Sequence, residues 1–192
     1  MIQNIKILKT ETLSDHWYVL KKIIYEYSKQ DGTIHTQTRE VYDRGNGAVI
    51  MLYNKEQRTV ILTRQFRLPT FVNGNESGMM IEACAGLLDQ DNAEDCIKRE
   101  TEEETGYKVT EVQKIFEAYM SPGSVTEILH FFIAEYSTDM KLTEGGGLAQ
   151  EEENIEVLEM GIDEAMAMLR NGEIKDAKTI ILLQYLKLHG IL

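Results

Sequence analysis

The chain has 192 residues, of which 43% are apolar and 27% are charged, as expected for one folded domain with at most a small additional unit. Its 32 acidic residues outnumber 20 basic ones and give a formal net charge of −12. This balance argues against a nucleic-acid partner, because a polyanion would be repelled. An acidic protein can still bind phosphate compounds when a divalent cation binds first and reverses the local charge.

Cysteine usage and hydropathy indicate the compartment. Cys84 and Cys96 are the only cysteines, and their spacing matches neither a zinc site nor a disulfide scaffold, so we expect a reduced, cytoplasmic protein. The N-terminus lacks the regions of a secretion signal, and no stretch approaches the roughly 20 apolar residues of a membrane-spanning helix. We therefore expect no membrane partner.

The first third of the chain predicts an antiparallel β region. Residues 17–27 are rich in Val, Ile and Tyr, Asp31-Gly32 predicts a turn, and residues 34–42 predict a further strand. Turn formers at residues 43–47 then predict a boundary. We expect an N-terminal β annex over residues 1–43 and a main domain over residues 44–192.

The main domain begins with apolar segments of strand character. Residues 48–53 and 59–67 flank a polar turn and predict a buried hairpin. A polar loop over residues 70–78 leads into a short strand over 79–84, and residues 85–89 predict a turn.

The remaining segments mix helices and strands. Ala93, Cys96 and Ile97 recur at helical spacing and predict a helix over about 93–105, which Gly106 ends. Further elements are strands over 112–119, 125–136 and 155–160, a polar loop over 137–154, and helices over 162–170 and 176–188. This order predicts an α/β (α+β) fold with a mixed sheet packed between helices.

Three carboxylates continue the apolar face of the predicted helix 93–105. Helical spacing from Ala93 and Ile97 places Glu100, Glu103 and Glu104 on the side that should face the protein interior. Partly buried acids so close together would raise one another's pKa values unless a cation kept them ionised. Oxygen ligands suit Mg²⁺, with Mn²⁺ as a possible substitute, whereas the four scattered histidines offer no zinc site. The alternative interpretation is an ordinary solvated acidic helix.

Residues 99–106 have the ordered pattern Arg-Glu-x-x-Glu-Glu-x-Gly. Five fixed residues in this order occur by chance far less often than a simple run of charged residues. Together with Ala85-Gly86 before it, this pattern resembles the signature of the Nudix hydrolases, which cleave nucleoside diphosphates linked to another group. The spacing from Gly86 to Arg99 is one residue shorter than in that family. Asn92 stands where the family has an acid, and Thr101 stands where it usually has an apolar residue.

Nearly the whole chain resembles the branch of that family that cleaves GDP-mannose, close to the branch that cleaves ADP-ribose. The resemblance implies a Nudix α/β/α sandwich and a homodimer formed with the help of the N-terminal β region. It also implies that Glu100, Glu104 and the carbonyl of Ala85 bind magnesium. Glu153 would be a metal ligand and catalytic acid–base group from the loop, with Glu103 as a further catalytic residue. Glu151 and Glu152 remain alternatives to Glu153.

The substrate-binding residues implied by the resemblance come from several segments. Arg67 would bind a phosphate through its guanidinium group. Alternatively, Arg67 is an ordinary surface arginine at the end of a strand. Trp17, Arg39 and Glu40 would address the base and sugar, although a lone tryptophan in a strand is more often part of a core. The other residues expected at the substrate are Gly86, Glu127 and Lys178.

The implied reaction is magnesium-dependent hydrolysis of a nucleotide sugar, most simply GDP-mannose to GMP and mannose 1-phosphate. One alternative is an ADP-ribose pyrophosphatase, which would use the same catalytic groups with a different base pocket. A second alternative is a Nudix domain that senses a nucleotide without cleaving it. The complete set of Glu100, Glu103 and Glu104 disfavours the sensor.

Overall fold

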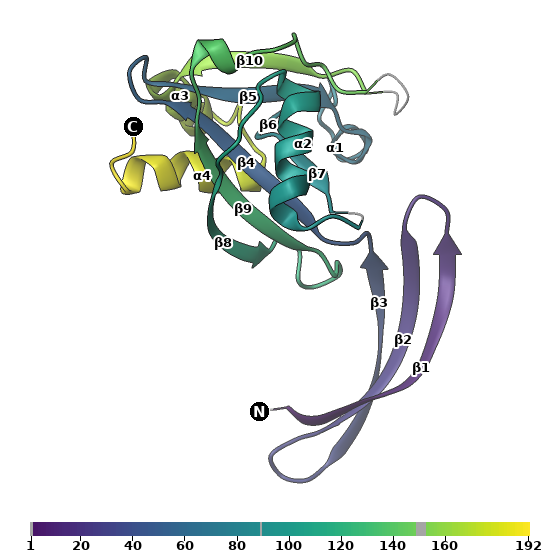
Figure 1. The fold of residues 1–192 in the computed structure, drawn as a ribbon. Coiled ribbons are helices and arrows are strands. Elements are labelled where there is room, and N and C mark those ends of the chain that lie inside the picture. The colour runs from purple at the N-terminus through teal and green to yellow at the C-terminus, as the bar shows by residue number, and fades with distance from the viewer. Residues whose placement is uncertain (1, 89, 149–152) are drawn as a thin grey trace. The chain divides into compact units, whose positions relative to one another are not determined.

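The computed structural model describes residues 2–88, 90–148 and 153–192 (Figure 1). The chain forms two compact units. The first comprises the residues up to Asn46 together with Tyr119–Ile128, and the second comprises Gly47–Ala118 and Leu129–Leu192.

The first unit contains a three-stranded antiparallel sheet in the order β1-β2-β3. Its strands are β1 (Gln3–Asp15), β2 (Val19–Ser28) and β3 (Ile34–Asp43). The predicted strands over 17–27 and 34–42 are confirmed as β2 and β3, whereas β1 was not predicted. Nearly every residue of β1 is exposed, so the strand lacks the alternation of buried and polar residues that marks a strand in sequence.

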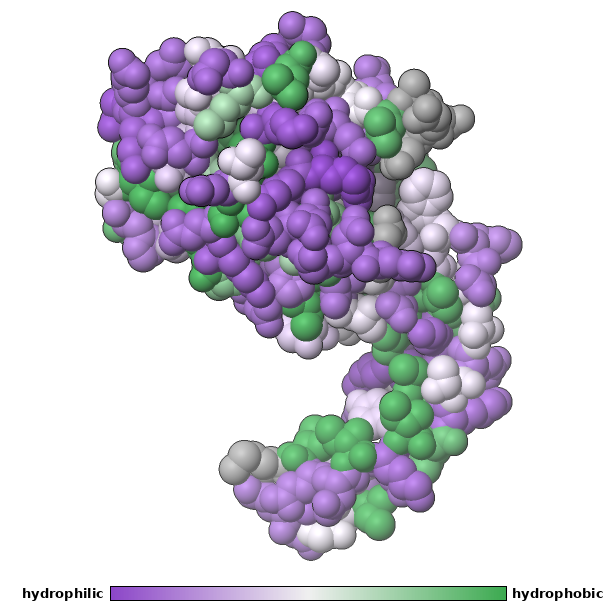
Figure 2. All heavy atoms as spheres, viewed as in Figure 1, coloured by the Kyte–Doolittle hydropathy of each residue, from purple (hydrophilic) through white to green (hydrophobic). Residues whose placement is uncertain are grey.

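This sheet leaves large apolar side chains in solvent. Ile5 and Ile7 of β1 and Ile34 of β3 are all more than half exposed. Figure 2 shows hydrophobic residues along these strands. Sheet edges and faces of this kind usually require cover from another chain or segment.

The second unit is built on a mixed seven-stranded sheet, which confirms the predicted fold class. Its main order is β10-β5-β4-β9-β8, with β6 paired to β5 and β7 paired to β4. The pairing of β4 with β9 is parallel, and the others that involve β4 and β5 are antiparallel. The strands are β4 (Gly47–Asn54), β5 (Thr59–Phe66), β6 (Met79–Glu82), β7 (Ala85–Leu87), β8 (Gln113–Tyr119), β9 (Ile128–Glu135) and β10 (Glu156–Gly161).

Helices cover both sides of this sheet. They are α1 (Leu68–Val72), α2 (Ala93–Thr105), α3 (Ile162–Asn171) and α4 (Ala177–Leu188), and Thr138–Met140 form the short 3₁₀ helix η1. Helix α2 packs on β4 and β7, and α4 packs on β4 (Figure 1). Strand β4 is buried along its whole length, because a central strand between two helical layers has no solvent face.

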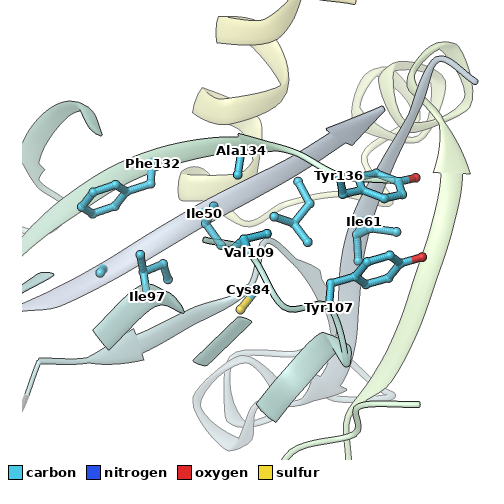
Figure 3. Close-up of a cluster of buried hydrophobic side chains, with 11 residues drawn as sticks. Ile50, Ile61, Cys84, Ile97, Tyr107, Val109, Phe132, Ala134 and Tyr136 are labelled. Atoms are coloured by element: carbon cyan, nitrogen blue, oxygen red, sulfur yellow. The ribbon is translucent and has the colours of Figure 1, made fainter. Parts of the chain in front are cut away.

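The main hydrophobic cluster lies between the sheet and α2. Ile50 of β4, Ile61 of β5 and Phe132 of β9 meet Ile97 of α2 there, together with Tyr107 just beyond its end (Figure 3). Because successive strand residues point to opposite faces, Val49 and Met51 lie on the other side of β4. Helix α2 is therefore fixed to the sheet by its buried apolar residues Cys96 and Ile97.

Two short segments differ from the sequence prediction. Residues 68–72 form α1 at the start of the expected polar loop 70–78, because Pro69 fits the first turn of a helix. Residues 85–87 form β7 and pair with β4 instead of making a turn. The predicted helices 93–105, 162–170 and 176–188 are confirmed as α2, α3 and α4.

Candidate active site

Helix α2 is held at both ends by local caps. The Asn92 side chain accepts hydrogen bonds from the backbone N–H groups of Glu94 and Asp95, so the residue at the family's acidic position is the N-cap. Gly106 ends the helix with a left-handed φ of 78°. Thr101 is fully buried, and its hydroxyl donates to the Ile97 carbonyl at 2.6 Å, which satisfies a polar group at a position that is usually apolar.

Two of the three predicted glutamates lie deep on the inner side of α2. Glu104 is 3% exposed, and the side chain of Glu100 is 16% exposed. Burial raises the pKa of Glu100 to about 7, with the nearby Arg99 acting in the opposite direction. Burial likewise raises the pKa of Glu104 to about 8, and the charges of Glu100 and Glu153 add to that rise. The inward placement expected for these two acids is correct.

Glu103 has a different setting. Its side chain is 25% exposed and pairs with Arg99 one helical turn earlier, at 3.0 Å between Oε2 and Nη1. The same Arg99 nitrogen lies 3.0 Å from Glu100 Oε1. Arg99 thus pairs with both Glu100 and Glu103 and partly offsets the repulsion between their carboxylates.

The chemistry of these acids suits a hard cation. Oε2 of Glu104 is buried and has no hydrogen-bond partner among the described residues, which is costly for a carboxylate without a bound ion. No group of three or more acidic, His or Cys side chains in the described ranges is arranged to hold a metal by itself. Backbone oxygen, water and substrate phosphate are the ligands that Mg²⁺ commonly adds to one or two carboxylates.

Gly86 brings the backbone of β7 against Glu100. A Cβ atom on residue 86 would stand within 3.0 Å of the Glu100 side chain, so only glycine allows this approach. Ala85, whose carbonyl is the predicted metal ligand, precedes it in the same strand. Strand β7 and helix α2 therefore present Ala85, Gly86 and Glu100 together, as the sequence motif suggested.

The glycine-rich loop covers the C-terminal end of α2. The N–H of Gly146 donates to the Glu104 carbonyl at 2.9 Å, and the N–H of Gly147 donates to the Glu103 carbonyl at 3.1 Å. Glu153 Oε2 accepts from the N–H of Leu148 at 3.0 Å. Glu153 is close enough to influence the pKa values of Glu100 and Glu104.

The three candidate loop glutamates are Glu151, Glu152 and Glu153. Glu153 belongs to the described residues and lies near the acids of α2. Glu151 and Glu152 lie outside the described residues.

Arg67 and Lys178 share one buried acid. Nε and Nη2 of Arg67 donate to Oε2 of Glu82 at 3.0 and 2.7 Å. Lys178 Nζ lies 3.5 Å from Oε1 of Glu82 and 2.9 Å from Oδ1 of Asp176. Burial is the largest single influence on the pKa of Arg67 and acts to lower it, but the charge and hydrogen bonds of Glu82, together with the charges of Glu104 and Asp176, leave that pKa raised.

The two cations differ in exposure. Arg67 directly follows β5, with its side chain 40% exposed and paired with Glu82, whereas Lys178, with its side chain 14% exposed between Glu82 and Asp176, is not an ordinary surface charge. Sequence reasoning missed Glu82 and Asp176. An acid inside the apolar run of residues 79–84 was the available signal for Glu82.

The remaining predicted residues belong to the first unit. Trp17 is 82% exposed in the turn between β1 and β2, which rules out a place in the core of this unit. Arg39 and Glu40 of β3 line an open groove of about 340 Å³ together with residues 122–126. The Glu127 side chain is 12% exposed and lies 3.5 Å from Nε of Arg44.

Comparisons with known proteins agree with this geometry. Residues 4–42 match the family model for the GDP-mannose pyrophosphatase NudK N-terminal domain, and residues 43–183 match the NUDIX domain model. The chain is 56% identical over 192 residues to a GDP-mannose pyrophosphatase of Yersinia enterocolitica, covering all of both chains. It is 54% identical to one of Escherichia coli O157:H7, with the same coverage. It is 56% identical over 186 residues to one of Citrobacter koseri, covering 97% of this chain and 96% of the relative.

A solved structure shares the fold. A crystal structure of an ADP compounds hydrolase has a TM-score of 0.72 at 18% identity, covering 100% of this chain and 99% of the other. Within the described residues, no helix is long and apolar enough to cross a membrane.

Proposed function

Because the chain belongs to the Nudix hydrolase family, we propose that it cleaves the pyrophosphate bond of GDP-mannose and releases GMP and mannose 1-phosphate. The protein is a hydrolase of pyrophosphate bonds. The observation that carries the proposal is the pair of inward-facing acids, the buried Glu104 and the partly buried Glu100, on the helix that packs against the Ala85-Gly86 strand. The full-length similarity to GDP-mannose pyrophosphatases supports the choice of sugar nucleotide.

Glu100, Glu104 and the carbonyl of Ala85 are proposed to hold Mg²⁺, or Mn²⁺ in its place. Oε2 of Glu104, which finds no hydrogen-bond partner among the residues described, and the raised pKa values of both acids support this assignment. When bound, such an ion neutralises phosphate oxygens and makes water more acidic. Glu103 is proposed to complete the acidic site, with Arg99 keeping its carboxylate beside Glu100.

Glu153 is proposed as the general base that takes the proton from the attacking water, and as a further metal ligand. Its nearness to Glu100 and Glu104 supports the role, because a base must come within hydrogen-bond reach of the proton it removes. Its contact with the N–H of Leu148 orients the carboxylate. Glu153→Gln should lower kcat by about a hundredfold with little change in substrate binding, in line with the usual contribution of a general base.

Two groups of residues are proposed to bind the substrate. Arg67, Lys178 and Gly86 would bind the phosphate groups, and Trp17, Arg39, Glu40 and Glu127 would bind the base and sugar. Exposure of the Trp17 ring supports stacking on a base. The groove lined by Arg39 and Glu40 supports a place for polar groups of the ligand.

We also propose a homodimer in which residues 1–43 provide much of the contact and residues 44–192 form the hydrolase domain. The exposed isoleucines of the N-terminal sheet support this division. Nucleic acids and membranes are not proposed partners. The cytoplasm is the proposed location because the spacing of Cys84 and Cys96 matches neither a zinc site nor a disulfide scaffold.

A substrate panel tests this function. Purified protein is incubated with GDP-mannose, other nucleotide sugars and ADP-ribose in Mg²⁺, and the products are separated by chromatography. The proposal predicts GMP and mannose 1-phosphate at the highest rate. Preferred cleavage of ADP-ribose would favour the alternative pyrophosphatase, and binding without any product would favour a sensor domain.

A further inference from the structure

Glu82 is a buried acid that has no role in the reaction proposed above. It ends β6 and is 5% exposed, in an apolar run where an isolated carboxylate would be strongly destabilising. Its position two residues before Cys84 and three before Ala85 places it directly upstream of the proposed metal ligand. A buried carboxylate is tolerated in a folded protein when positively charged groups pair with it.

Each oxygen of Glu82 faces a different cation. Oε2 accepts both hydrogen bonds from Arg67, at 3.0 and 2.7 Å, and Oε1 lies 3.5 Å from Lys178 Nζ. Two nitrogens of the planar guanidinium are thereby fixed, which sets the plane of the group. Nη1 of Arg67 has no hydrogen-bond partner among the described residues.

A second set of contacts ties the same carboxylate to the N-terminus of α4. Asp176 accepts from Lys178 at 2.9 Å and from the Thr179 hydroxyl at 2.6 Å. The Thr179 hydroxyl in turn accepts from the N–H of Ala83 at 2.6 Å. Helix α4 is thus bonded to the residue next to Glu82, so the cations and the strand that carries Ala85 share one hydrogen-bonded network.

In the protein without substrate, the two positive charges of this network are balanced by two negative charges. Arg67 and Lys178 would repel each other across a shared site, and Glu82 and Asp176 offset both charges. Arg67 also lies close enough to Glu104 for that acid to raise its pKa. The network therefore connects the acids of α2 with the two cations that phosphate groups would meet.

We propose that Glu82 is a positioning residue, which holds Arg67 and Lys178 in the orientation that binds the phosphate groups of a nucleoside diphosphate substrate. This inference rests on the proposed function. It assigns to Glu82 an effect on binding and turnover that acts through Arg67 and Lys178. A purely structural ion pair would change the thermal stability of the protein and leave the activity of the folded molecules unaltered.

The test compares Glu82→Gln with a matched exposed pair on the same sheet. Glu156 of β10 pairs with Arg64 of β5, and both side chains are about half exposed, so Glu156→Gln removes a carboxylate of little energetic weight. Both variants are made in the full chain, and kcat/KM is measured with GDP-mannose and Mg²⁺. Arg67→Ala and the double variant Glu82→Gln/Arg67→Ala complete a cycle.

The proposal predicts a loss of about 10- to 100-fold in kcat/KM for Glu82→Gln, as a misplaced binding group typically costs, and none for Glu156→Gln. In the Arg67→Ala background, Glu82→Gln should cost much less, because its effect passes largely through Arg67. Unchanged kcat/KM in Glu82→Gln, or a loss that adds in full to that of Arg67→Ala, overturns the proposal. If Glu82→Gln fails to fold, Glu82→Asp gives the same comparison with the charge retained.

A binding measurement separates this inference from the choice of substrate. Calorimetric titration with inorganic pyrophosphate in Mg²⁺ should show binding about tenfold weaker in Glu82→Gln than in the wild type and Glu156→Gln. If the wild type cleaves no nucleotide sugar but this difference appears, the proposed function fails and the positioning role stands. Equal pyrophosphate affinity in all three proteins overturns the positioning role.

Discussion

Gly86 lies so close to Glu100 that the carboxylate occupies the space where any other residue would carry its Cβ atom. The contact joins strand β7 to helix α2 at the point where the sequence motif has its Ala-Gly pair and its first glutamate. Glu100 is held in this position by Arg99, at 3.0 Å. The glycine is thus required by a side chain across the site, since its φ is not in the left-handed region.

Gly86→Ala should therefore impair activity far more than stability. The atoms in the way belong to the flexible end of Glu100, which moves aside at small cost but leaves its ligand position. We expect kcat to fall about a hundredfold, with a melting temperature within about 4 °C of the wild type. Gly161→Ala is the control, because a Cβ there meets nothing within 4 Å. Equal activities of the two variants would refute the role given to this contact.

Glu104→Gln should stabilise the metal-free protein. Oε2 of Glu104 is buried and has no hydrogen-bond partner in the part of the chain that the structure describes, and an amide removes the charge that burial disfavours. In the presence of a chelator, we expect a melting temperature several degrees above that of the wild type at about pH 8. Glu102→Gln, on the more exposed side of α2 beside Lys108, should show no such gain. A lower melting temperature for Glu104→Gln would count against an uncompensated buried charge.

The stability of the metal-free protein should depend on pH through Glu100 and Glu104. Their pKa values in the folded protein, about 7 and about 8, lie above the ordinary value of 4.5, so the folded state binds more protons than the unfolded state. Their stabilising contribution is complete below about pH 4.5 and is lost as the pH rises through 7 and 8. Added Mg²⁺ should reverse the loss at the alkaline end.

Thermal melting in chelator across this range measures the effect. The double variant Glu100→Gln/Glu104→Gln is the reference, because it retains every other titrating group. The wild type should lose stability relative to this reference between about pH 5 and pH 9. A difference that stays constant, or that grows in favour of the wild type, would show that the two acids do not titrate as described.

Ile7 should contribute to dimer formation. Its side chain is 61% exposed on β1, and burial of an isoleucine against a second chain is worth about 1.5–3 kcal/mol. Ile7→Asp should therefore weaken the dimer by about tenfold or more, as measured by analytical ultracentrifugation. Lys6→Asp places a charge on the opposite face of the strand and should have a smaller effect. A wild-type protein that is monomeric at all accessible concentrations would contradict the homodimer.

Local rules account for what the sequence predicted well. Helix α2 was found with its correct limits because its apolar spacing, its N-terminal Asn92 and its terminal Gly106 all act within the segment. Strand β1 was missed because its pairing with β2 stabilises it, and that pairing is invisible in a strand that buries no face. The motif identified Glu100 and Glu104, but the ion pair of Arg67 with Glu82 depends on the pairing of β5 with β6.

Hydrolysis of GDP-mannose by the wild type and Glu104→Gln, side by side with Mg²⁺ and with excess chelator, tests the central claim most directly. We expect the wild type with Mg²⁺ to release equal amounts of GMP and mannose 1-phosphate. Chelator or Glu104→Gln should reduce that rate by at least about a hundredfold, while the melting temperature shows that the variant is folded. Undiminished product release in chelator, or by the folded Glu104→Gln variant, would contradict a cation-dependent reaction at the acids of α2.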